Sequence, residues 1–223
     1  MATETRGMFI TFEGAEGSGK STQARLLALA LQNDGLPVLF TREPGGTPIA
    51  DQIRHVILTP ENTAMVPEAE VLLYSASRAQ HVAERIRPAL VRGQIVVCDR
   101  FADSTMAYQG YGLGLDLAML RVVTKFATGG LTPDLTIYLD CPVDVGLARK
   151  REAARQGGEW NRLDRKPIEY HERVRQGYLE LARTESHRWQ VIDATGPVES
   201  VQDAVHAAVA PHLETLWQPP LLP

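Results

Sequence analysis

Residues 14–21, Gly-Ala-Glu-Gly-Ser-Gly-Lys-Ser, match the pattern of a phosphate-binding loop. The glycines let successive backbone N–H groups turn toward phosphate oxygens, and the amino end of a following helix adds a favourable dipole. Lys20 would reach the β- and γ-phosphates, and the Ser21 hydroxyl would ligate Mg²⁺. We therefore predict ATP and Mg²⁺ as ligands. The residues expected at ATP are Gly14, Ala15, Glu16, Gly17, Ser18, Gly19, Lys20, Ser21 and Thr22.

Charged residues also follow the second and third apolar runs of the chain. Arg42 precedes a Pro-Gly-Gly turn that begins at Pro44, an arrangement suited to bidentate capture of a phosphate. Asp99 ends the third run, where P-loop enzymes carry a Mg²⁺-linked carboxylate. Arg100, beside it, would face phosphate oxygens. A flat ring and an amide, Tyr108 and Gln109, could meet a nucleobase edge.

The elements that must position these groups alternate along the chain. Nearly continuous apolar runs of four or five residues fit strands that are covered on both faces. They are Met8–Phe12, Val38–Thr41, Ile95–Cys98, Leu135–Leu139 and Trp189–Ile192. Helical patterns cover Ser21–Asn33, Ile49–Leu58, Pro67–Arg92, Leu115–Thr128, Val143–Ala154, Ile168–Thr184 and Val198–Leu216. This order predicts an α/β fold with a parallel, doubly wound, five-stranded sheet and helices on both faces.

The 223 residues suit one domain, 1–223, with flexible ends at 1–6 and 218–223. The net charge of −4 argues against a general nucleic-acid binder. No apolar run approaches the ~18 residues of a membrane span, and no signal pattern opens the chain. Cys98 and Cys141 lie in apolar runs and indicate buried thiols in a reducing compartment. We expect a cytoplasmic protein without nucleic-acid or membrane partners.

The motifs together resemble those of thymidylate kinases. The match begins with Phe12-Glu13-Gly14 and continues through Arg42-Glu43-Pro44-Gly45-Gly46. It then takes in Asp99-Arg100-Phe101 with Ala107-Tyr108-Gln109-Gly110, and ends with Asn161-Arg162-Leu163-Asp164. These elements follow in collinear order over nearly the whole chain. The resemblance implies a nucleoside monophosphate kinase fold, transfer of phosphate from ATP to dTMP, and a homodimer.

The resemblance also implies roles for single residues. Arg42 and Arg100 would hold the dTMP phosphate, and Arg78 would donate to a thymine carbonyl. Tyr74 stands where many bacterial relatives carry the Phe that stacks on thymine, and Tyr can stack equally well. The full dTMP set is Glu13, Arg42, Pro44, Tyr74, Arg78, Arg100, Ser104, Thr105, Tyr108 and Gln109. Glu13 would lie near the sugar and the metal's water shell, Tyr108 would favour deoxyribose, and Gln109 would pair with the N3 edge. Ser21 and Asp99 would hold the metal.

The phosphate loop has no cation between Gly14 and Gly19, so the positive charge must come from elsewhere in the chain. The resemblance implies a mobile lid, at about 149–166, that supplies it. Residues 149–175 carry nine Lys or Arg against five Asp or Glu, a local charge of +4. An arginine on the migrating phosphate can raise the rate about 10³–10⁵-fold. We rank Arg162 first and Arg155 second, and we expect Arg149 to stack on adenine. The predicted catalytic residues are Lys20, Arg162, Arg100, Glu13 and Arg155.

Two alternatives remain open from the sequence. A kinase for another nucleoside monophosphate would share the phosphate loop, the Mg²⁺ chemistry and the lid. Only Tyr74, Arg78, Tyr108 and Gln109 distinguish the two. A GTP-dependent switch would carry Asn-Lys-x-Asp after a strand. The nearest string, Asn161-Arg162-Leu163-Asp164, lacks the lysine.

Overall fold

The computed structural model describes residues 7–216. The ends for which we predicted flexibility, 1–6 and 218–223, lie outside the described residues. Five strands form one parallel sheet in the order β2-β3-β1-β4-β5. Their bounds are β1 Met8–Glu13, β2 Val38–Arg42, β3 Ile95–Asp99, β4 Leu135–Asp140 and β5 Trp189–Asp193. The predicted strands and their parallel arrangement are confirmed.

Each strand extends one residue past the predicted end and takes in a charged residue. These residues are Glu13, Arg42, Asp99, Asp140 and Asp193. Apolar runs report burial, whereas ladder hydrogen bonds involve only the backbone and continue into the first polar position. Phe12 and Arg42 both pair with Asp99, so the charged ends line up along one edge of the sheet.

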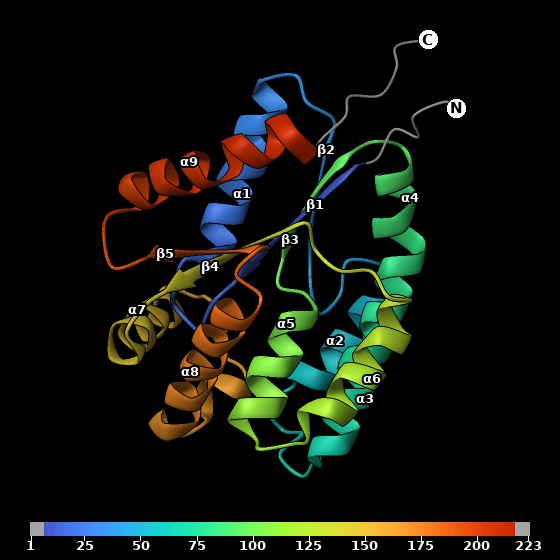
Figure 1. Cartoon of the computed structure of the whole chain (residues 1–223). Helices are drawn as coiled ribbons and strands as arrows, with labels where there is room; N and C mark the ends of the chain where they lie inside the picture. The colour runs from blue at the N-terminus through green and yellow to red at the C-terminus, as the bar shows by residue number, and fades with distance from the viewer. Residues whose placement is uncertain (1–6, 217–223) are drawn as a thin grey trace.

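Helices cover both faces of the sheet (Figure 1). The helices are α1 Lys20–Asn33, α2 Pro48–Leu58, α3 Pro67–His81, α4 Arg87–Val91, α5 Ala102–Thr105, α6 Leu117–Thr128, α7 Val143–Arg155, α8 Ile168–Thr184 and α9 Val198–Leu216. Helices α1 and α9 lie on one face, where Leu27 and Val205 belong to the same buried apolar cluster as Ile10 of the central strand. On the other face Tyr138 of β4 packs with α8 through Tyr178, and their rings stack 5.1 Å apart.

The predicted helix Pro67–Arg92 is helical over nearly all its length but changes type within it. A π-helical turn, η1 Val82–Ile86, separates α3 from α4. Pro88 follows this turn at the start of α4 and has no N–H to donate. Wider turns are a known accommodation to such breaks in the hydrogen-bond ladder, and here Arg87 N–H donates to Val82 O, five residues back.

The predicted start of the helix at Leu115 is two residues early. The Asp116 carboxylate caps α6 by accepting from Ala118 N–H at 2.8 Å, so the helix begins at Leu117. Sequence reasoning missed α5 and the π-helical η2, Met106–Gly112, because two glycines and a run of polar residues hide any helical period. It also missed the short 3-10 turn η3, Leu163–Arg165, within the stretch expected to form the lid.

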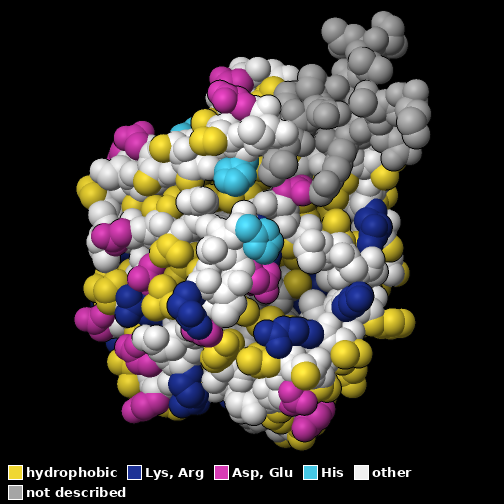
Figure 2. Space-filling model, viewed as in Figure 1, with side chains coloured by type: hydrophobic (Ala, Val, Ile, Leu, Met, Phe, Trp, Pro, Cys, Tyr) yellow, Lys and Arg dark blue, Asp and Glu magenta, His cyan; other side chains and the backbone are white. Residues whose placement is uncertain are grey.

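Charge on the visible face is mixed. Figure 2 shows basic and acidic side chains interspersed with apolar and neutral ones over the lower half of the molecule, where α5, α6 and α8 lie in Figure 1. Within residues 7–216, no helix has the length and apolar character needed to cross a membrane.

Candidate active site

The phosphate loop follows β1 and leads into α1, as predicted. Gly14, Gly17 and Gly19 have φ of +157°, +71° and +88°, which a residue with a Cβ adopts at a cost. Gly17 has a second constraint. A Cβ there would overlap the backbone carbonyl of Gly146 in α7, so the loop and α7 touch backbone to backbone. The loop is thus held against the helix that leads into the lid.

A cleft of about 790 Å³ opens at the carboxyl edge of the sheet. It brings together segments that are far apart in sequence: the phosphate loop, the ends of β2 and β3, α2, α3, η2 and the lid. Most of the predicted site residues line it. They are Glu16, Gly17, Gly19, Lys20, Ser21, Thr22, Arg42, Pro44, Tyr74, Asp99, Arg100, Ser104, Thr105, Tyr108, Gln109 and Arg149. The predicted residues that do not line it are Glu13, Gly14, Ala15, Ser18, Arg78, Arg155 and Arg162.

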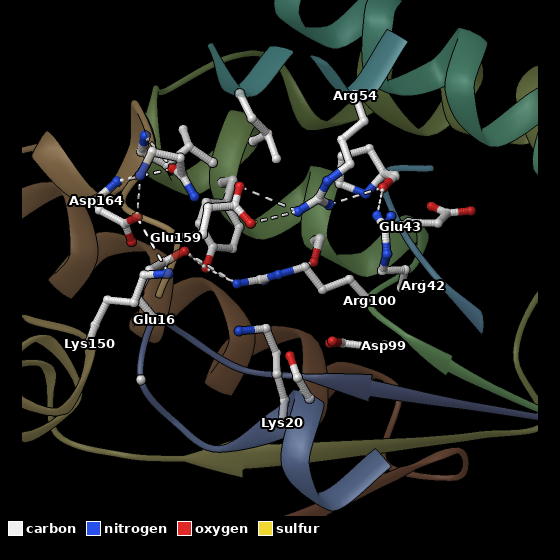
Figure 3. Close-up of a pocket in the computed structure, with 18 of the residues that line it drawn as sticks. Glu16, Lys20, Arg42, Glu43, Arg54, Asp99, Arg100, Lys150, Glu159 and Asp164 are labelled. Carbon is white, nitrogen blue, oxygen red and sulfur yellow. Dashed lines mark hydrogen bonds and ion pairs between the residues drawn. The ribbon is translucent and has the colours of Figure 1, made fainter. Parts of the chain in front are cut away.

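Lys20 and Asp99 lie at the floor of this cleft, with Arg100 above them (Figure 3). The Lys20 ammonium donates to Ala15 O at 3.4 Å. Burial of the ammonium and the nearby Arg100 charge lower the pKa of Lys20 to about 8. Asp99 carries a buried carboxylate oxygen, Oδ1, that has no hydrogen-bond partner among the described residues.

Arg100 is the centre of a polar cluster in the cleft. Its guanidinium donates to Tyr108 Oη at 2.8 Å and to Glu16 Oε1 at 3.2 Å. It also donates to Ser104 Oγ and Tyr178 Oη, each at 3.2 Å. Its backbone φ is +71°. Among the described residues, no other residue apart from glycines has a positive φ. A residue held in this conformation indicates a position where geometry outweighs backbone preference.

Glu16 links the phosphate loop to this group. Its Oε1 accepts the Tyr108 hydroxyl at 2.7 Å, and its Oε2 lies 3.4 Å from Nδ1 of the buried His171. Burial alone would raise the pKa of Glu16. The nearby His171 ring and the charges of Arg100 and Lys20 outweigh burial and bring this pKa well below its usual range. Glu16 therefore stays ionised.

Glu13 lies behind the cleft. Its carboxylate accepts from Phe101 N–H at 2.8 Å, Ser104 Oγ at 2.6 Å and Tyr178 Oη at 2.8 Å. Burial, and then the charge of Asp103, raise the pKa of Glu13 to about 7. Its contacts make it a support for the residues that surround Arg100, and a direct contact with dTMP or the metal's water shell stays a prediction.

Arg78 is buried in a second polar network. It donates to Glu43 Oε2 at 2.7 Å, Thr105 Oγ1 at 2.9 Å and Phe101 O at 3.1 Å. The other oxygen of Glu43 lies 3.1 Å from His81 Nδ1. The predicted bond from Arg78 to a thymine carbonyl stays a prediction, since its guanidinium is engaged within the protein.

The two arginines ranked highest for the lid are not brought to the phosphate loop. Arg162 is buried and donates to the Glu70 carboxylate and to Ile57 O. A buried guanidinium needs a carboxylate partner, and Glu70 of α3 provides one. The side chain of Arg155 is 78% exposed and pairs with Glu152. Arg149 lines the cleft, but its guanidinium donates to Ala194 O and Thr195 O, both at 2.8 Å.

Other cleft residues were missed from the sequence. Arg54 of α2 donates to Glu159 Oε2 at 3.1 Å and to Pro44 O at 3.1 Å, a pair that crosses the cleft to the lid segment (Figure 3). Lys150 lies 3.6 Å from Asp164 Oδ2. The sequence could have indicated Lys150 as a site residue, because the chain has few lysines and this one lies in the basic segment 149–175. Nothing in the sequence indicates that Arg54 pairs with Glu159, because the two residues are 105 positions apart.

Kinases that act on nucleoside monophosphates hold two phosphate groups against one another in a single cleft. A phosphate loop facing Arg42 and Arg100 at the edge of this parallel sheet places the chain in that class of P-loop enzymes. A sequence profile described as thymidylate kinase matches residues 12–205. The chain belongs to the thymidylate kinase family, as the sequence motifs predicted.

Individual relatives support this family assignment. A thymidylate kinase from Roseiflexus sp. (strain RS-1) is 55% identical over 217 residues, covering 94% of this chain and 96% of the relative. A thymidylate kinase from Geobacter sulfurreducens is 53% identical over 201 residues, covering 89% of this chain and 94% of the relative. The crystal structure of thymidylate kinase from Ehrlichia chaffeensis superposes with a TM-score of 0.75 at 31% identity, covering 92% of this chain and 99% of that one.

Proposed function

We propose that this chain transfers the γ-phosphate of ATP to dTMP, giving ADP and dTDP. The observation that carries the proposal is one cleft in which the phosphate loop meets Arg42, Arg100, Tyr74 and Gln109. Membership of the thymidylate kinase family supports dTMP over other acceptors. The two free, buried thiols, Cys98 and Cys141, are in keeping with action in the reducing cytoplasm.

In the proposal, the phosphate loop and Lys20 hold the β- and γ-phosphates of ATP. Arg42 and Arg100 hold the phosphate of dTMP, with Pro44, Ser104 and Thr105 around it. Tyr74 stacks on thymine, Tyr108 packs against the deoxyribose, and Gln109 meets N3. The cleft position of these side chains supports the assignment. Roles for Arg155 and Arg162 over ATP, and for Arg149 at adenine, stay predictions, since all three are bonded elsewhere.

Mg²⁺ fits the residues at the cleft floor. Asp99 Oδ1 is buried without a hydrogen-bond partner in the described part of the chain, and Ser21 lines the same cleft. Hydroxyl and carboxylate oxygens are the donors Mg²⁺ takes, and it keeps most of its shell for water and substrate phosphates. We assign Ser21 and Asp99 to it. When bound, it would neutralise charge on the β- and γ-phosphates.

The protein's part in the reaction is to position and to stabilise charge. An oxygen of the dTMP phosphate attacks the γ-phosphorus in line, and the bond from that phosphorus to the bridging oxygen breaks as ADP leaves. No covalent enzyme intermediate is required. Lys20 and Arg100 line the same cleft, and in the proposal they hold the two phosphates together against their mutual repulsion. The lid segment, 149–166, would exclude water.

A homodimer is part of the proposal. Helices α3 and α6 lie side by side (Figure 1) and expose large apolar side chains. Leu72 is 61% exposed, Val122 69% and Phe126 89%. Apolar surface of this kind marks association sites, and a second copy is the occupant that the family implies. Phe126→Glu with Val122→Glu should shift the mass measured by light scattering from dimer to monomer. A monomeric wild-type chain would refute this part.

A substrate panel tests the function. The enzyme is assayed with ATP against dTMP, dCMP, dGMP and dAMP, and with GTP as an alternative donor. We expect dTMP to give the highest kcat/KM. Faster turnover with another monophosphate would favour the alternative kinase, and tight GTP binding without phosphoryl transfer would favour a switch.

A further inference from the structure

Behind the residues proposed to read the base, Glu70 joins three segments of the chain. It lies in the first turn of α3 and is 2% exposed. Its Oε1 accepts from Gln109 Nε2 of η2 at 2.7 Å. Its Oε2 accepts from the Arg162 guanidinium in the lid segment. Each carboxylate oxygen therefore has its own partner.

This arrangement determines which way the Gln109 amide faces. A carboxylate oxygen accepts hydrogen bonds, so Glu70 takes the NH₂ group of Gln109 and leaves the amide oxygen on the other side. No residue among those described donates to that oxygen, and Gln109 lines the cleft. An amide oxygen in that position suits a donor on the ligand. Thymine presents a donor at N3, whereas N3 of cytosine is an acceptor.

We infer that Glu70 is a positioning residue for base specificity, because it holds the Gln109 amide with its oxygen ready for thymine N3–H. The inference rests on the proposed role of Gln109 at the base. It also gives Arg162 a part in base discrimination. Arg162 only donates, so it requires an acceptor from residue 70.

The spacing along α3 supports this assignment. Glu70, Tyr74 and Arg78 follow at intervals of four and lie on one face of the helix. Tyr74 lines the cleft, and Arg78 contacts Thr105, which also lines it. One face of α3 therefore supplies a stacking ring and the carboxylate that orients the amide.

The test is Glu70→Gln, assayed with dTMP and 5-methyl-dCMP, two substrates that both carry the methyl group. Arg162 would force the new amide to turn its oxygen toward the guanidinium and its NH₂ toward Gln109. Gln109 would then flip and present NH₂ to the base, which suits cytosine N3. We expect the ratio of kcat/KM for dTMP over 5-methyl-dCMP to fall at least about tenfold. A ratio within about twofold of wild type in the folded variant overturns the inference.

Adding Arg162→Met to Glu70→Gln removes the force that orients the new amide. This double variant should give a ratio between those of wild type and Glu70→Gln. It also leaves no unpaired charge, so it decides the question if the single variant does not fold. A wild-type ratio in the double variant would then count against Glu70.

Two further variants separate the possible failures. Asp103→Asn is the matched control, since Asp103 is 6% exposed and pairs with Arg188 at 2.8 Å. It should lower the melting temperature without changing the ratio, and a changed ratio there would make the effect of Glu70→Gln unspecific. Gln109→Leu tests the underlying role. If it lowers the ratio and Glu70→Gln does not, only the role of Glu70 fails. If neither lowers it, Gln109 does not read N3.

Discussion

Arg100 combines a side chain proposed to hold the dTMP phosphate with an unfavourable backbone conformation, and a pair of substitutions separates the two effects. Arg100→Ala and Arg100→Gly remove the same hydrogen bonds to Tyr108, Glu16 and Ser104. Both leave Glu16 without its guanidinium partner. They differ in the backbone at φ +71°, which glycine adopts freely and alanine does not.

The size of the difference follows from two opposing terms. Placing a Cβ in the left-handed region costs about 1–2 kcal/mol. Glycine loses about 0.5–1 kcal/mol relative to alanine through its greater freedom in the unfolded chain. The glycine variant should therefore be the more stable by about 0.5–1 kcal/mol, or roughly 1–4 °C for a chain of this length. Both variants should lose at least about tenfold in kcat/KM for dTMP, because a charged hydrogen-bond donor is gone.

The assay is urea unfolding of both variants under identical conditions, followed by circular dichroism. Ala102→Gly is the control, since Ala102 is the first residue of α5 and its φ is not positive. There glycine should destabilise by up to about 1 kcal/mol, the opposite sign. An Arg100→Ala variant as stable as Arg100→Gly would refute the reasoning, because the backbone at residue 100 would then carry no strain.

Three other outcomes are expected. Lys20→Ala should lower kcat about 10³-fold with the fold retained, since an ammonium ~4 Å from a phosphate charge contributes about 4 kcal/mol at an effective dielectric constant of ~20; near-normal kcat would remove Lys20 from the chemistry. Glu13, with its pKa raised from 4.5 to about 7, binds its proton more tightly when folded, so its contribution to stability is complete below pH 4.5 and is lost as the pH rises through 7. Wild type should therefore lose roughly 3 kcal/mol relative to Glu13→Gln between pH 4.5 and 8, measured as the difference in urea unfolding free energy; a difference that stays constant with pH would contradict this. Gly146→Ala would place a methyl group against Glu16 O of the phosphate loop and should raise KM for ATP more than KM for dTMP, and equal effects on both would show that the loop is not displaced.

The fold could be predicted almost completely from the sequence, because its strands are continuous apolar runs and its helices begin and end at ordinary signals. The helix α8 was predicted at its observed bounds, Ile168–Thr184. The exceptions have local causes. Only the side-chain hydrogen bond of Asp116 reveals that α6 begins at Leu117. The helix over residues 102–112 has no period that a pattern could detect.

The site was predictable where a residue's place depends on the strand ends. Arg42, Asp99 and Arg100 reach the cleft because parallel strands end at a common edge. The lid could not be predicted in the same way. The place of Arg162 depends on its pairing with Glu70, 92 residues away, and a count of positive charges contains no information about that partner. The partners of Arg78 and Arg54 were hidden for the same reason.

The register of the sheet has a consequence for how this chain can change in length. Asp99 pairs laterally with both Phe12 and Arg42. The strands themselves therefore space the carboxylate proposed to hold the metal, the start of the phosphate loop and an arginine proposed to hold a phosphate. One residue inserted in β3 would move Asp99 by about 3.3 Å and turn its side chain to the other face. Insertions or deletions in the connections that enter the strands, such as residues 129–134 before β4, leave this spacing intact. Among homologues and in engineered libraries, insertions and deletions should therefore be common at the amino edge of the sheet and rare at the carboxyl edge.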